Sequence, residues 1–232
     1  MADKKTPTPL LLTLVALTMV SGLVDAVCYL GLGRVFTANM TGNVVVLAFA
    51  AAGAPGFSVT ATLTSLALFL VGAFCAGWAA PRLTKSNGSR SRLLLVAMAT
   101  EACLVGAAAL IAFLQASVGT GWPRYVVITL LAFAMGVRNA TVRRLAVPDM
   151  TTTVLTMTLT GLAADAAVPG KEHGAAAYRR AAAVVAMLIG AIIGATTYLH
   201  VGAALPLLIA ALVVTAAGIA LRLSPGSMTP EH

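Results

Sequence analysis

The residues most able to do chemistry in this chain are the few polar side chains that fall inside or beside long apolar stretches. A carboxylate or carboxamide in such surroundings costs several kcal/mol unless it is paired, so its presence marks a candidate functional position. The candidates are Asp25, Asn39, Asn43, Glu101, Arg138, Asn139, Asp149 and Asp165.

Several of these residues recur in two similar arrangements along the chain. Residues 22–26 (Gly-Leu-Val-Asp-Ala) align with residues 136–140 (Gly-Val-Arg-Asn-Ala), and a polar segment follows each. The first segment, residues 39–44, begins Asn-Met-Thr, and the second, residues 149–154, begins Asp-Met-Thr. This pattern indicates an internal repeat.

Each half of the repeat supplies one acid and one amide, in exchanged order. Asp25 precedes Asn39 in the first half, whereas Asn139 precedes Asp149 in the second. This reciprocity suggests a binding site shared between the halves, with Thr hydroxyls added by the polar segments. The predicted binding residues are Asp25, Asn39, Thr41, Asn43, Arg138, Asn139, Asp149 and Thr151.

Two interpretations of these polar residues stay open. Asn39 and Asp149 each stand where a side chain caps a helix start, so they would serve only to satisfy buried backbone groups. Alternatively, the capped helix ends also line a solute or ion pathway. Asp25 and Arg138 occupy nearly equivalent positions and are predicted to form an ion pair, either static or functional.

No motif for catalysis or metal binding is present. Cys28, Cys75 and Cys103 lack paired spacing and a neighbouring histidine cluster. The phosphate loop, the nucleophile elbow and the His-Glu-x-x-His pair are all missing from the sequence. We therefore expect no enzyme, no catalytic residue, no metal and no cofactor. An intramembrane enzyme would have to use Glu101 or Asp165, and Glu101 also fits a proton carrier or a contact with a partner subunit.

The elements that position these residues are long apolar helices. Apolar residues make up 59% of the chain and charged residues 9%, and the mean hydropathy is +0.96, which indicates lipid as the solvent. About 20 apolar residues are needed to cross a bilayer. Full-length spans are predicted at residues 9–31, 60–80, 92–115, 124–142, 181–200 and 203–222. Two shorter stretches, residues 40–53 and 151–164, are predicted to be re-entrant or half helices.

The positive charges select one threading of these segments, because cytoplasmic loops collect Lys and Arg. If all eight segments crossed, the charges would be divided almost evenly. If the two short segments enter and leave on one side, thirteen positive residues are cytoplasmic and only Arg34 and Arg124 lie outside. Both termini are then cytoplasmic. The net charge of +8 is explained by topology, so no nucleic-acid partner is expected.

The predicted fold is an all-α polytopic membrane protein with six transmembrane helices and two short ones. Residues 1–232 form one transmembrane domain, with repeat halves at about 9–115 and 124–222. Since each half crosses three times, the second half is inserted upside down, as a 3+3 inverted repeat. A small-residue face recurs at residues 72–77 and 190–194, which favours close helix contact and is compatible with a homo-oligomer.

The residues that carry the repeat also resemble a known family. Residues 22–26, Tyr29-Leu30, Val35-Phe36, 39–43, 136–140, Arg143-Arg144-Leu145 and 151–156 are similar to the bacterial YoaK-like membrane family, over nearly the whole chain. The resemblance implies a multi-pass protein of the bacterial inner membrane. It implies no reaction or substrate, because that family is defined as a domain of unknown function.

The function we predict from the sequence is a small transporter or channel with a polar site near the bilayer midplane, for an unidentified solute or ion. The alternative is a non-transporting scaffold or accessory protein, whose polar residues only seal helix ends and whose small-residue faces bind partner helices. A solvated central cavity would favour the transporter.

Overall fold

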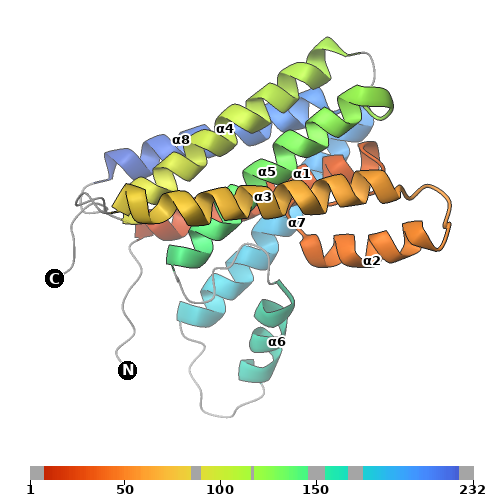
Figure 1. Cartoon of the computed structure of the whole chain (residues 1–232). Coiled ribbons are helices and arrows are strands. Elements are labelled where there is room, and N and C mark those ends of the chain that lie inside the picture. Colours follow the sequence, from red (N-terminus) through yellow and green to blue (C-terminus); the bar gives the residue numbers. More distant parts are fainter. Residues whose placement is uncertain (1–7, 85–89, 116–117, 146–154, 167–174, 225–232) are drawn as a thin grey trace.

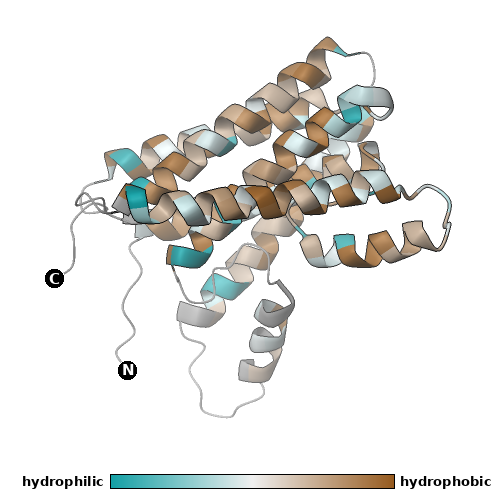
Figure 2. Cartoon of the chain, viewed as in Figure 1, coloured by the Kyte–Doolittle hydropathy of each residue, from teal (hydrophilic) through white to brown (hydrophobic). Residues whose placement is uncertain are grey.

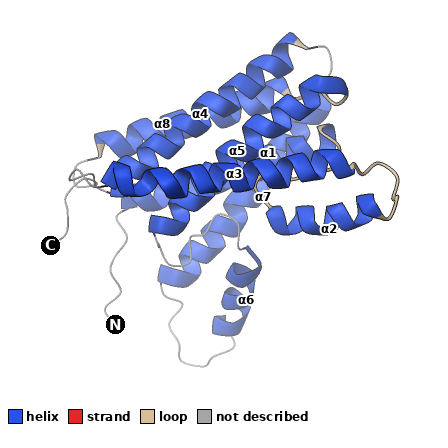
Figure 3. Cartoon of the chain, viewed as in Figure 1, coloured by secondary structure: helices blue, strands red, loops and turns tan. Residues whose placement is uncertain are grey.

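The computed structural model describes residues 8–84, 90–115, 118–145, 155–166 and 175–224. Throughout these ranges every regular element is a helix (Figure 1, Figure 3). The helices are α1 (Thr8–Gly31), α2 (Met40–Ala51), α3 (Val59–Thr84), α4 (Arg90–Leu114), α5 (Gly121–Leu145), α6 (Leu155–Ala166), α7 (Ala175–Val201) and α8 (Ala204–Leu223). The predicted all-helical fold is confirmed.

Six of these helices, α1, α3, α4, α5, α7 and α8, are long and apolar enough to cross a membrane. They coincide with the six predicted spans. Helices α2 and α6 contain 12 residues each, which corresponds to about 18 Å of helix. That length is too short for a hydrocarbon core of about 30 Å, as predicted for the two short segments.

The outward faces of the long helices are apolar. Phe74 is 73% exposed, Phe113 78% and Leu199 69%. Apolar residues predominate along these helices, and strongly hydrophilic ones gather toward helix ends (Figure 2). Such a surface would promote aggregation in water, but it matches the hydrocarbon of a bilayer.

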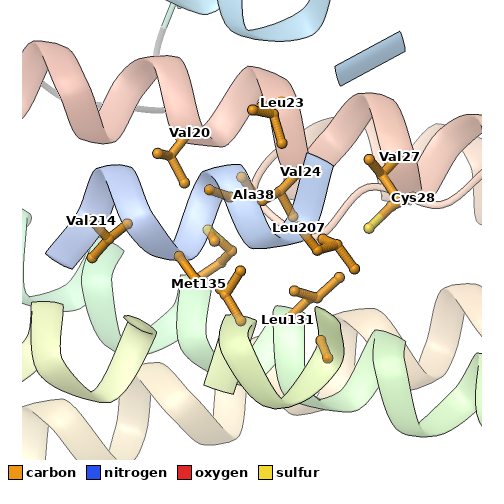
Figure 4. Packing of buried hydrophobic residues seen from close by; sticks show 14 of the residues in the cluster. Val20, Leu23, Val24, Val27, Cys28, Ala38, Leu131, Met135, Leu207 and Val214 are labelled. Atoms are coloured by element: carbon orange, nitrogen blue, oxygen red, sulfur yellow. The ribbon is translucent and has the colours of Figure 1, made fainter. Parts of the chain in front are cut away.

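The interior is filled by aliphatic side chains from helices that are distant in sequence. Helix α1 runs along α7 and also packs on α8, while α3 runs along α5 and α4 packs on both α5 and α8. Figure 4 shows Val24 of α1, Met135 of α5 and Leu207 of α8 in one cluster of buried residues, and all three are completely buried. Helix α1 is thus a central element, and polar residues on it lie deep in the bundle.

Glycines allow the closest helix pairs to touch backbone to backbone. A Cβ atom on Gly22 of α1 would overlap the carbonyl oxygen of Met187 in α7, and one on Gly190 of α7 would overlap that of Met19. In the other pair, Gly136 of α5 meets the carbonyl of Phe69, and Gly72 of α3 meets that of Phe133, in the same manner. The predicted close contact through small residues is confirmed at these positions.

Gly77 does not take part in this packing, so its predicted role is wrong. A Cβ atom added there would meet nothing within 4 Å, whereas one added at Gly194 would meet the backbone of Leu23. The reason is helical geometry. Gly77 lies five residues after Gly72, which turns it about 140° around the helix axis, whereas Gly194 lies four residues after Gly190 and is turned by only about 40°. A side chain at position 77 would therefore point away from α5, although the Gly77 carbonyl accepts a hydrogen bond from Arg144 of α5 at 3.1 Å.

Candidate functional site

The loop between α1 and α2 turns back into the bundle and is held there by Asp25. The Asp25 carboxylate accepts backbone hydrogen bonds from Thr37 at 2.7 Å, from Ala38 at 2.8 Å and from Asn39 at 3.1 Å. Asp25 is 4% exposed and lies six residues before the end of α1, which is about 9 Å along the helix. The start of α2 therefore lies within the bundle, about a quarter of the way along α1 from its C-terminal end, rather than at the rim.

Asn43 in the first turn of α2 anchors the same loop. Its Oδ1 accepts from the Phe36 amide at 2.8 Å, and its Nδ2 donates to the Phe36 carbonyl at 2.7 Å and to Ser65 Oγ of α3 at 3.2 Å. The Ser65 hydroxyl also donates to the Phe36 carbonyl. One carboxamide thus ties the loop, α2 and α3 together, and Asn43 is completely buried.

The predicted cap at Asn39 is confirmed, although its hydrogen bond is weak. The Asn39 side chain accepts from the Gly42 amide at 3.4 Å, a long hydrogen bond compared with those to Asp25. Thr41, another predicted binding residue, is exposed on α2. The α1–α2 loop contains two left-handed residues, Gly33 (φ 91°) and Arg34 (φ 59°), which reverse the chain direction.

A second polar cluster joins three helices through a buried ion pair. Arg138 of α5 donates from Nη1 to Glu101 Oε1 of α4 at 2.8 Å and to the Leu17 carbonyl of α1 at 3.0 Å, and from Nη2 to Ser21 Oγ. Both charged side chains are 0% exposed. Glu101 stands near the centre of α4, and the Arg138 side chain can reach that level because helical side chains lean toward the N-terminus.

The predicted ion pair between Asp25 and Arg138 is wrong. Both Asp25 oxygens are occupied by loop amides, and Arg138 bonds to Glu101 instead. Sequence reasoning left Glu101 out of the binding residues because the other half has no matching acid. The feature that could have identified Glu101 is its central position in an apolar span. Its partner in the other half is a cation, Arg138, rather than an acid.

The two clusters meet along α1. Ser21 and Asp25 are one helical turn apart, about 6 Å along the axis, and we call Ser21, Asp25, Asn43, Glu101 and Arg138 the polar centre. In the described part of the chain, Glu101 Oε2 and Arg138 Nε are buried and lack a hydrogen-bond partner. Buried polar atoms are nearly always bonded, so such exceptions call for a proton, a water molecule or an ion.

The other predicted residues belong to the second half. Asn139 is half-buried on α5, and Asp165 lies in α6. Asp149 and Thr151 lie outside the described residues, so the convergence of the two halves on one site stays a prediction. Over the ranges that the structure describes, no three His, Cys, Asp or Glu side chains are grouped so as to hold a metal ion.

Replacing Asp25 by Asn tests its role as the loop anchor. The substitution removes the charge and turns one acceptor into a donor facing an amide, so a buried N–H loses its partner at a cost of about 1–3 kcal/mol. We expect a lower unfolding midpoint in a detergent titration. Thr64→Val on α3 is the control, because its hydroxyl bonds only within its own helix. Equal stability of the two variants would contradict the anchor.

Comparison with known proteins supports the membrane architecture. The family model "Protein of unknown function (DUF1275)" matches residues 13–220. The chain is also similar to the UPF0700 transmembrane protein YoaK of Bacillus subtilis (strain 168), with 35% identity over 155 residues. That alignment covers 67% of this chain and 65% of the relative. No solved structure matches.

The family match extends into all six long apolar helices. Together with the transmembrane relative, these helices make this a multi-pass membrane protein. The resemblance seen in residues 22–26, 39–43 and 136–140 is confirmed, since these motifs lie within the matched region. The chain belongs to the DUF1275 family.

Proposed function

We propose that this protein is a small inverted-repeat transporter in which the Glu101–Arg138 pair forms the exchange site for a proton or a small solute. The observation that carries the proposal is the buried Glu101 Oε2, which has no hydrogen-bond partner among the described residues although Oε1 is paired. An ionisable residue inside a membrane is costly and is by default a functional candidate.

The energetics favour function over stability as the reason for this pair. Replacing a buried ion pair with apolar residues is often neutral or stabilising, so such a pair is weak evidence for a structural role. An incompletely satisfied pair is less favourable still. A carboxylate that keeps one oxygen unoccupied is suited to accept a proton, or a hydrogen bond from a passing solute.

The proposed inverted repeat is supported by the glycine contacts. Gly22 and Gly136 are equivalent in the repeat, and each meets the carbonyl of a residue that precedes a partner glycine by three positions, Met187 before Gly190 and Phe69 before Gly72. The reverse contacts follow the same rule. Three long helices in each half, an odd number, then require opposite insertion of the halves.

The geometry of α2 supports a re-entrant half helix that starts inside the bundle. Its N-terminus lies beside Asp25, so the partial positive charge of the helix end is already balanced by a carboxylate. Glu101 and Arg138 are balanced with each other. A centre without an excess of positive charge favours a neutral solute, with a proton as the coupling ion, over an anion.

We also propose the bacterial inner membrane as the location, with both termini in the cytoplasm. Arg124 Nε donates to the Leu32 carbonyl at 2.8 Å, so the two positive residues assigned outside, Arg34 and Arg124, belong to one end of the bundle. Arg82 and Arg144 lie at the opposite end of the bundle, near the C-terminus of α3. There Arg82 donates to the Trp78 carbonyl and Arg144 donates to the Gly77 carbonyl. Because Arg138 lies inside the bundle, it no longer counts as a loop charge, and the remaining distribution of twelve positive residues inside against two outside supports this orientation.

A non-transporting scaffold is the second candidate, and one observation favours it. Asp25 and Asn43 use their polar atoms to hold the α1–α2 loop and α3. These bonds satisfy backbone groups buried in the membrane, which a purely structural role requires. In this case the polar centre would exclude water, and the protein would act through its exposed apolar faces.

Cysteine accessibility in right-side-out and inverted vesicles separates the two functions. On a background without Cys28, Cys75 and Cys103, we expect Ser21→Cys to react with a membrane-impermeant thiol reagent, because a transporter exposes its centre to water. Phe74→Cys is the control, since Phe74 is 73% exposed on a span and should face lipid. Reaction of Ser21→Cys no faster than the control would support the scaffold instead.

The same vesicles test the half helix. Met40→Cys and Ala52→Cys bracket α2, and both should react only from the outer face. Reaction from opposite faces would mean that α2 crosses the membrane, which would contradict the inverted repeat whatever the result at Ser21.

A further inference from the structure

An open groove of about 460 Å³ runs along the face of the bundle between α4 and α8. Its lining includes Met98 and Val214, which are 2% and 0% exposed and form the floor. Gly218 widens the groove, because a Cβ atom there would meet only the Met98 side chain, at 3.7 Å from Cε and 4.0 Å from Cβ. Helices α4 and α8 lie side by side in Figure 1.

Two arginines stand at the same end of this groove. Arg92 is the third residue of α4 and Arg222 is the second from the end of α8, and both line the groove. Both are exposed, and neither has a hydrogen-bond or ion-pair partner within the described part of the chain. None of the residues lining the groove is acidic, so its charged end is uniformly positive.

The dimensions match one leaflet of a bilayer. From Arg92 to Ala102, the limits of the groove on α4, the helix rises about 15 Å. A hydrocarbon core is about 30 Å thick, so the apolar part of the groove extends from a membrane surface to about the midplane. Both helices that form it are candidate membrane spans.

We propose that this groove binds an anionic phospholipid, with its phosphate between Arg92 and Arg222 and one acyl chain along the floor. Arginine pairs well with phosphate because its planar guanidinium offers several donors in a fixed geometry. Basic sites between transmembrane helices are suited to anionic headgroups. The apolar floor can contact the acyl chain of a phospholipid. A free phosphate ion has no acyl chain and could not use this surface.

The test is lipid binding by the purified full-length protein in detergent, followed by native mass spectrometry. Phosphatidylglycerol should bind more tightly than phosphatidylcholine. Each arginine contributes roughly fivefold to binding of an anionic lipid, so the Arg92→Gln/Arg222→Gln double variant should lose roughly 25-fold in affinity for phosphatidylglycerol. Affinity for phosphatidylcholine should be nearly unchanged.

Two matched variants keep the test specific. Arg82→Gln/Arg143→Gln removes the same charge from the last turns of α3 and α5, outside the groove, and should leave phosphatidylglycerol binding unchanged. Ala99→Phe fills the groove without altering charge and should weaken binding of both lipids.

Three results would overturn the proposal. Equal losses in the two double variants would mean that only the overall surface charge acts. Competition by inorganic phosphate at the strength of the lipid would mean a simple ion site. Disulfide-linked dimers of Ile219→Cys, formed in membranes on the cysteine-free background, would place a second copy of the chain in the groove.

Discussion

Replacing Arg138 by leucine is expected to destabilise the protein by about 3–5 kcal/mol, because it leaves the Glu101 carboxylate buried without a counter-charge. The Leu17 carbonyl and the Ser21 hydroxyl lose their donor in the same step. The loss is measured as the shift of the unfolding midpoint in a titration of detergent-solubilised protein with sodium dodecyl sulfate. Arg143→Leu on the same helix is the control, since Arg143 is exposed and should change stability by less than about 0.5 kcal/mol.

The double variant Glu101→Leu/Arg138→Leu distinguishes a functional pair from a structural one. Removing both charges should restore most of the stability, since apolar replacement of a complete buried pair is often neutral or better. If the pair serves transport, a cysteine at position 21 should no longer react with the membrane-impermeant thiol reagent in this double variant, even though its stability is restored. A single Arg138→Leu variant as stable as Arg143→Leu would show that Glu101 is not charged against Arg138, and would remove the basis of the proposed function.

Adding one methyl group at Gly136 is expected to cost about 3 kcal/mol, the upper end of overpacking effects. The new Cβ would overlap the Phe69 carbonyl oxygen and approach the Ala73 amide nitrogen to 2.9 Å. Both neighbours are backbone atoms of a helix, so they cannot rotate away as a side chain would. The α3–α5 pair must therefore separate, which should appear as a lower thermal midpoint and as aggregation during size-exclusion chromatography.

Two comparisons sharpen this prediction. Gly106→Ala on α4 is the control, because a Cβ atom there meets nothing within 4 Å, and this variant should keep normal stability. Gly22→Ala at the equivalent position of α1 should lose about as much as Gly136→Ala. A large effect at Gly22 with none at Gly136 would argue against two matched halves.

Several features of the fold were predictable because they depend on composition along the chain. Length and hydropathy located all six long helices, since the bilayer thickness sets how many apolar residues a crossing needs. The same reasoning found the 12-residue helix at Met40–Ala51. The motif at residues 39–43 was also informative, because Asn39 caps α2 and Asn43 anchors the α1–α2 loop.

The partners of the polar residues were not predictable in the same way. Pseudo-equivalent sequence positions suggested that Arg138 would meet Asp25, but Arg138 meets Glu101, 37 residues away in sequence. The tilt and rotation of each helix decide which way a side chain points, and these depend on packing against neighbours. Gly77 is a different case, because its spacing of five residues from Gly72, rather than four, already turns it away from the contact that Gly72 makes.

The amino-acid sequence was enough to identify a multi-pass membrane protein of the DUF1275 family, with six apolar helices and a short helix capped by Asn39. Hydropathy, charge bias and short motifs act locally, so they can be read without knowing the packing. Three features became visible only in the packed fold: Asp25 holds the α1–α2 loop, Glu101 and Arg138 form the buried pair, and α4 and α8 leave a groove between them. These contacts join helices far apart in the chain, and their geometry exists only once the helices are packed.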